Sequence, residues 1–80
     1  MIRVYMIRVP IYNTEREKAR MAVGFLRDVK STWAYISAES QDFIEITLVC
    51  EPYIEAYNRI YINRKLPKAT FYPIQKDDEI

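Results

Sequence analysis

The chain has 80 residues, half of them hydrophobic, and a formal net charge of +1 at pH 7. This length accommodates one domain, near the lower limit at which a hydrophobic core suffices without disulfides or metal. The small net charge gives no overall electrostatic attraction to nucleic acid. The single cysteine excludes an intramolecular disulfide, and no apolar run approaches the ~20 residues that cross a bilayer. We therefore expect a soluble, cytoplasmic protein with no membrane association.

The first segment predicts a strand followed by a helix. Residues 2–9 are apolar on both alternating sets apart from Arg3 and Arg8, which is typical of a central strand. Thr14 and Glu17 have the spacing of a capping box, so we expect a helix that begins at Thr14. One face of this helix carries apolar residues at helical spacing. These residues are Ala19, Ala22, Val23, Leu26 and Val29.

The next two segments predict a hairpin. Residues 32–37 alternate, with Ala34 on one side and Trp33 and Tyr35 on the other, as in an outer strand. Polar residues 39–42 contain no glycine, so the connecting loop should be longer than two residues. Residues 43–50 are the most apolar run of the chain and predict the middle strand of a sheet.

Residues 52–65 predict a second helix. Pro52 suits the first helical position, and the apolar face should comprise Tyr53, Ala56, Tyr57 and Ile60. The alternative is a strand at residues 59–63, because this stretch has strong β character. Acidic residues early and basic residues late in the segment favour the helix. The ladder of Tyr53, Tyr57 and Tyr61 is interpreted as core packing with hydroxyls at the margin.

Residues 69–74 predict a last strand, which Pro73 confines to a sheet edge. The order of elements predicts an α+β fold, a ferredoxin-like βαββαβ sandwich. Its four-stranded antiparallel sheet should carry two helices on one face and leave the other face open. We expect one domain over residues 1–75 and a flexible acidic tail over residues 76–80.

The residue types argue against catalysis. The chain has no histidine, and its single glycine excludes a glycine-rich phosphate loop. Cys50, at the start of the second helix, is the candidate nucleophile of a thiol-dependent enzyme. Because Glu51 is adjacent and no histidine can assist, we interpret Cys50 as a buried structural thiol. We predict that the chain is not an enzyme and holds neither cofactor nor metal.

The open sheet face is the predicted partner-binding site. Aromatic and arginine side chains are the types enriched where protein interfaces are strongest. The predicted site comprises Arg3, Tyr5, Ile7, Trp33, Tyr35, Phe43 and Glu45. The leading hypothesis is a small non-catalytic interaction module that homodimerises or docks a protein partner, compatible with a regulatory or inhibitory role.

The alternative hypothesis is binding of single-stranded RNA or DNA by the same face, through Arg3, Tyr5, Trp33 and Tyr35. Against it, the third strand lacks the glycine-and-aromatic pattern of RNA-recognition sheets, and Glu45 would place a carboxylate among phosphates. A separate basic patch on the first helix comprises Arg16, Arg20, Gly24 and Arg27. Gly24 is interpreted as a solvent-facing residue; the alternative is close approach of a partner or a phosphate.

Overall fold

The computed structural model describes residues 2–10 and 15–74 of the chain. Six elements follow in the order β1 (Arg3–Pro10), α1 (Glu15–Arg27), β2 (Thr32–Glu39), β3 (Phe43–Cys50), α2 (Pro52–Lys65) and β4 (Thr70–Pro73). Residues 59–63 belong to α2, so the helical interpretation is confirmed and the strand alternative is wrong. The predicted N-cap Thr14 and the predicted tail at residues 76–80 lie outside the described residues.

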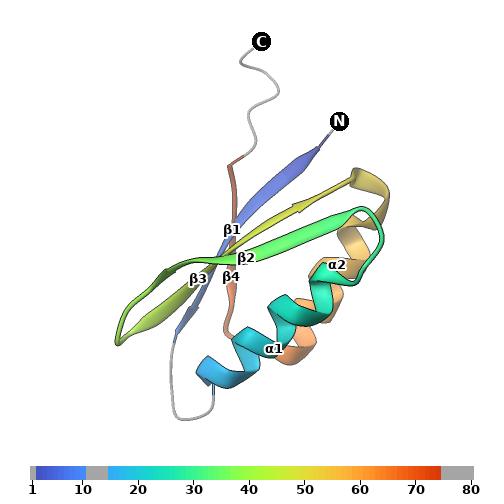
Figure 1. Ribbon diagram of the computed structural model, residues 1–80. Coiled ribbons are helices and arrows are strands. Elements are labelled where there is room, and N and C mark those ends of the chain that lie inside the picture. Colours follow the sequence, from blue (N-terminus) through green and yellow to red (C-terminus); the bar gives the residue numbers. More distant parts are fainter. Residues whose placement is uncertain (1, 11–14, 75–80) are drawn as a thin grey trace.

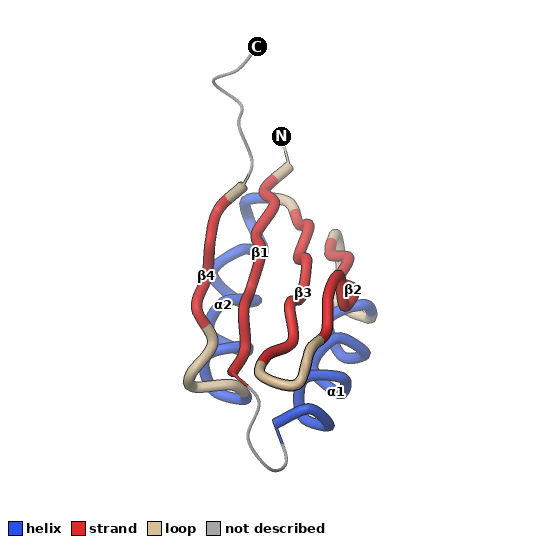
Figure 2. Tube along the Cα trace, turned by 90° about the vertical axis from the view of Figure 1, so that its left-hand side faces the viewer, coloured by secondary structure: helices blue, strands red, loops and turns tan. Residues whose placement is uncertain are grey.

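The strands form one antiparallel sheet in the order β2-β3-β1-β4 (Figure 2). Both helices lie on the same side of this sheet, and the opposite side carries no element among the described residues (Figures 1 and 2). The predicted ferredoxin-like arrangement is thus confirmed. β1 and β3 occupy the centre, as their apolar composition predicts, because central strands are covered on more sides than edge strands.

The core lies between the sheet and the helices. It takes alternate residues of the two central strands, with Ile7, Ile46 and Leu48 fully buried. α1 contributes a buried face through Ala19, Ala22, Val23 and Leu26, as its spacing predicts. The predicted face also included Val29, which packs against the core but follows the end of α1 at Arg27. Burying a valine, leucine or isoleucine side chain in this core stabilises the fold by about 1.5–3 kcal/mol.

α2 is rotated relative to the prediction. Its buried residues are Asn58 and Ile62, whereas Tyr53, Tyr57 and Ile60 are each more than half exposed. The helix is apolar on more than one side, so spacing alone does not distinguish the inward face. Asn58 turns inward because its Nδ2 donates to Thr32 Oγ1 at 3.0 Å. The predicted apolar face was therefore wrong.

The tyrosine ladder of α2 is not core packing as a whole. Tyr53 and Tyr57 are more than half exposed, and the Tyr53 hydroxyl lies 2.6 Å from Ser31 Oγ. Tyr61 is half-buried and packs against the core, where its ring stacks on Phe25 with the centroids 4.1 Å apart. The core-packing interpretation holds for Tyr61 and fails for the other two rings.

The hairpin between β2 and β3 has the predicted long loop. Three residues, numbered 40–42, join the strands. The Ser40 hydroxyl accepts hydrogen bonds from the backbone N–H groups of Asp42 and Phe43. These bonds stabilise the turn although it contains no glycine. A bulge between Ile36 and Ala38 shifts the pairing register next to this loop.

Candidate interaction surface on the open sheet face

One row of side chains crosses all four strands on the face away from the helices. Register places Tyr35 beside Thr47, Thr47 beside Met6, and Met6 beside Tyr72. Cross-strand neighbours share a face, so these four side chains form a continuous band. Tyr35 and Tyr72 are 41% and 47% exposed at its two ends, while Thr47 at the centre is 8% exposed. The band therefore has an exposed tyrosine at each end and a more buried centre.

A second row lies beside the first, toward the start of β1. Trp33 pairs with Val49, and Val49 pairs with Val4. The Trp33 side chain is 51% exposed, and both valines are half-buried. We define the open-face patch as the apolar residues of the two rows. They are Val4, Met6, Trp33, Tyr35, Val49 and Tyr72.

The charged residues at the other end of this face neutralise one another. Arg8 Nη2 lies 3.9 Å from Glu45 Oε2, and the Arg8 guanidinium lies 4.3 Å from the centre of the Phe43 ring. Ser37 also donates its hydroxyl to the Glu45 backbone carbonyl at 3.2 Å. The predicted site residues Phe43 and Glu45 thus lie on the open face, at the border of the patch. This border carries one paired charge of each sign.

Three predicted members of the binding face lie on the opposite side of the sheet. Ile7 is fully buried beneath the helices, and Tyr5 is 7% exposed. Arg3 shares their alternating set, and its Nε lies 3.5 Å from Glu55 Oε1 of α2. The placement of Arg3, Tyr5 and Ile7 on the open face was therefore wrong. Both alternating sets of β1 are apolar, so the strand's own pattern does not say which set faces the helices.

Buried polar contacts explain why a tyrosine takes a core position in β1. The Tyr5 hydroxyl donates to Glu55, and the Arg59 guanidinium lies over the Tyr5 and Phe71 rings at 5.3 and 4.9 Å. Burial, followed by the neighbouring Glu55 carboxylate, raises the pKa of Tyr5 above its ordinary value of 10.0. The sequence did not indicate that Glu55 and Arg59 contact Tyr5, because these contacts depend on which face of α2 is turned toward the sheet.

The missed members of the open-face patch are Val4, Met6, Val49 and Tyr72. Val49 shares the alternating set of Phe43 and Glu45, so the pattern of β3 alone could have placed it. Val4 and Met6 follow once Tyr5 is assigned to the core. Tyr72 requires the register of β4 against β1, which no feature of the sequence specifies.

The predicted basic patch on α1 is engaged in internal contacts. Arg16 and Arg20 both pair with Glu39 of β2, the second at 2.9 Å. Arg27 Nε donates to the Ala34 carbonyl oxygen at 2.8 Å. Gly24 is exposed, and a Cβ built on it would meet nothing within 4 Å. The arginines therefore fasten α1 to β2, and Gly24 marks no close approach within the chain.

The Cys50 thiol has the environment of a structural residue. It is 1% exposed, and its burial raises the pKa above the ordinary value of 9.0. A raised pKa lowers the fraction of reactive thiolate near neutral pH. This geometry supports the structural interpretation over a nucleophile.

Comparison of the chain with protein-family models, with curated proteins and with solved structures found no match. Within the described residues, neither helix has the length and apolar character required to span a bilayer. The same residues contain no group of three or more cysteine, aspartate or glutamate side chains placed to hold a metal ion. Function is therefore inferred from the geometry of the chain's own surfaces.

Proposed function

We propose that this chain is a small non-catalytic interaction module that homodimerises through the open face of its sheet. The observation that carries the proposal is the band from Tyr35 across Thr47 and Met6 to Tyr72, with Trp33 beside it. Exposed aromatic rings around a centre without charged residues are typical of the buried core of an interface, where charged residues are depleted.

A second copy is the occupant that the charge distribution favours. The six residues of the open-face patch carry no charge, and the adjoining Arg8 and Glu45 already pair with each other. A partner with a strong charge of either sign would gain little from such a surface. In a two-fold pair each copy presents the same patch, so apolar rows meet apolar rows.

The size of the face suits such a pair. Strands about 4.8 Å apart, most of them eight residues long, give the sheet a projected area of roughly 450 Å². Side chains roughen that surface, so a face-to-face pair approaches the lower range of specific interfaces, about 600 Å² per partner. An 80-residue domain also gains stability from association, because it buries a smaller fraction of its surface than larger domains do.

The positions of the charged side chains argue against nucleic-acid binding by this face. Two of the four residues on which that hypothesis depended, Arg3 and Tyr5, lie on the helix side. Arg8 remains on the open face, but it is paired with Glu45. A base-stacking surface needs cations free to meet phosphates. Arg27, which reaches this face beside Trp33, is already held by the Ala34 carbonyl oxygen and the Trp33 ring.

The test is the solution mass of the wild type and two double variants, measured by light scattering over a concentration series. Trp33→Ala/Tyr35→Ala removes two rings of the open-face patch and should convert the dimer to a monomer. Tyr53→Ala/Tyr57→Ala is the matched control, because it removes two exposed rings from α2 and should leave the dimer intact. A wild type that stays monomeric at every concentration, or a control that dissociates equally, would refute the proposal.

A further inference from the structure

The groove between the two helices is a second surface, on the opposite side of the molecule from the open-face patch. The helices α1 and α2 run antiparallel, and a stripe of side chains from each of them lines this groove. The stripe along α1 and the turn that follows it comprises Lys18, Met21, Ala22, Phe25, Asp28 and Val29. The stripe of α2 comprises Ile54, Tyr57, Tyr61, Arg64 and Lys65.

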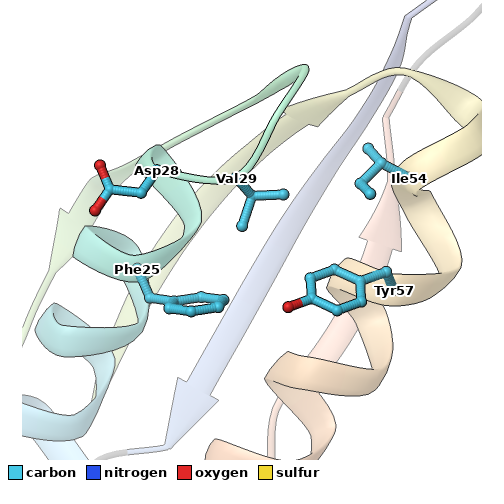
Figure 3. Close-up of a pocket in the computed structure, with 5 residues that line it drawn as sticks. All are labelled: Phe25, Asp28, Val29, Ile54 and Tyr57. Atoms are coloured by element: carbon cyan, nitrogen blue, oxygen red, sulfur yellow. The ribbon is translucent and has the colours of Figure 1, made fainter.

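The stack of Phe25 on Tyr61 divides the groove into two halves. The first half has a volume of about 350 Å³ and is lined by Phe25, Val29, Ile54 and Tyr57. Figure 3 shows the rings of Phe25 and Tyr57 pointing toward each other across the gap, with Val29 and Ile54 above them in the view. Asp28 points away from the gap in the same view. This half of the groove is therefore apolar.

The second half is lined by both apolar and positively charged residues. Its volume is about 450 Å³, and its apolar residues are Met21, Ala22 and Tyr61. Met21 is 67% exposed and Tyr61 is half-buried, so this half presents apolar surface to solvent. Lys18, Arg64 and Lys65 line the same half.

Those three cations differ from the arginines on the other side of α1. Arg16 and Arg20 pair with Glu39, whereas no carboxylate among the described side chains pairs with Lys18, Arg64 or Lys65. Lys65 instead lies over the Tyr61 ring, with its Nζ 6.0 Å from the ring centre. Three like charges around one hollow repel one another, and an anionic partner would relieve that repulsion. A ligand that combines an apolar surface with negative charge would therefore complement this half of the groove.

We infer that this groove binds an amphipathic helix of a protein partner that carries carboxylates at one end. Helices dock into such grooves through apolar side chains at i, i+3, i+4 and i+7. The facing stripes span about three helical turns, roughly 17 Å. The apolar face of the partner would cover Met21, Phe25 and Tyr57, and its carboxylates would meet Lys18, Arg64 and Lys65. A second copy fits less well, because its groove lining brings the same three cations and Asp28 as the one carboxylate.

The experiment is a selection of displayed helical peptides of about 15 residues on the full chain. Their apolar positions are fixed at helical spacing, and their polar positions are randomised. Selected peptides should be rich in Asp and Glu at one end and should shift the amide signals of Met21, Phe25 and Tyr57 in NMR spectra. Peptides without that acidic bias, or shifts confined to the sheet face, would overturn the inference.

Charge variants make the test specific. Lys18→Glu/Arg64→Glu/Lys65→Glu should weaken binding of a selected peptide by about tenfold or more, whereas Lys18→Arg/Arg64→Lys/Lys65→Arg should leave it nearly unchanged. Trp33→Ala/Tyr35→Ala should bind like the wild type, so failure of the sheet-face proposal and failure of this one are distinguishable. If no peptide is selected and the chain instead adsorbs to phosphatidylserine vesicles through the same three cations, the inference is overturned. The ligand of this surface would then be an anionic membrane and not a helix.

Discussion

The guanidinium of Arg27 lies 4.6 Å from the centre of the Trp33 ring, and its Nε donates to the Ala34 carbonyl oxygen at 2.8 Å. Arg27 belongs to α1 on the covered side of the sheet, whereas Trp33 lies on the open side. The arginine therefore reaches around the edge of β2. It holds the largest ring of the open-face patch in place and occupies an acceptor on the sheet edge, where a foreign strand could otherwise pair.

Replacing Arg27 should weaken the fold and loosen this ring. Arg27→Ala is expected to lower the free energy of unfolding by about 1 kcal/mol, because a hydrogen bond and a cation–π contact are lost at a partly exposed site. Urea denaturation followed by Trp33 fluorescence measures the change. Lys30→Ala is the control, since no described side chain pairs with it. Equal stability of the two variants would mean that the Arg27 contacts contribute nothing.

Stability should fall in alkaline solution because the pKa of Tyr5 is raised. The unfolded tyrosine loses its proton near pH 10 while the folded one keeps it, so unfolding becomes more favourable as the pH rises above 10. Below pH 10 the contribution is fully present. Tyr5→Phe should be less stable at pH 7, by about 1 kcal/mol for the lost hydrogen bond to Glu55. It should also show a shallower decline above pH 10. A decline as steep as that of the wild type would contradict this assignment.

Gly24→Ala should stabilise the protein. Gly24 lies inside α1, its position is exposed, and a Cβ there meets nothing within 4 Å. Alanine is favoured over glycine in a helix interior by about 1 kcal/mol. Thermal unfolding of the two proteins measures the difference. Destabilisation would reveal a close contact at Gly24 that the isolated chain does not have, such as a partner already seated on α1.

The Cys50 thiol should be nearly inert in the folded protein. Burial keeps it protonated and out of reach of reagents, so alkylation by iodoacetamide at pH 7.5 should require opening of the structure. The expected rate in native buffer is at least about a hundredfold below that in denaturant. Comparable rates in the two conditions would restore Cys50 as a candidate nucleophile.

The elements whose patterns admit one interpretation were oriented correctly, although their ends differ: α1 ends at Arg27, before the predicted face residue Val29, and β2 continues to Glu39. α1 has one apolar stripe, and β2 has one apolar and one aromatic set, so both orientations follow from spacing alone. β3 was placed at the centre of the sheet because its run is long, apolar and β-branched.

The elements whose patterns admit two interpretations were oriented wrongly. In β1 both alternating sets are apolar, and a tertiary contact between Tyr5 and Glu55 decides between them. In α2 the polar Asn58 faces inward because it has a partner in Thr32, and the predicted apolar face remains in solvent. Each choice depends on a residue about 25 or more positions away. The local pattern therefore specified the elements and their order, but not which face of β1 and of α2 turns toward the core.

The orientations of β1 and α2 explain why apolar side chains are exposed on both sides of the molecule. With Tyr5 and Ile7 in the core, Val4 and Met6 join the open-face patch. With Asn58 and Ile62 in the core, Tyr57 and its neighbours line the groove between the helices. A domain this small covers one side of its sheet, and its remaining apolar surface is divided between two faces.

Trp33 provides the most direct test of the proposed dimer, because it is the only tryptophan in the chain and lies in the open-face patch. Its emission spectrum should be recorded over a dilution series of the wild type and of Tyr35→Ala/Tyr72→Ala. The proposal predicts that the wild-type emission moves to longer wavelength on dilution, as the ring becomes solvent-exposed, and that the variant emits at long wavelength throughout. A wild-type spectrum that is independent of concentration and typical of an exposed indole would contradict it.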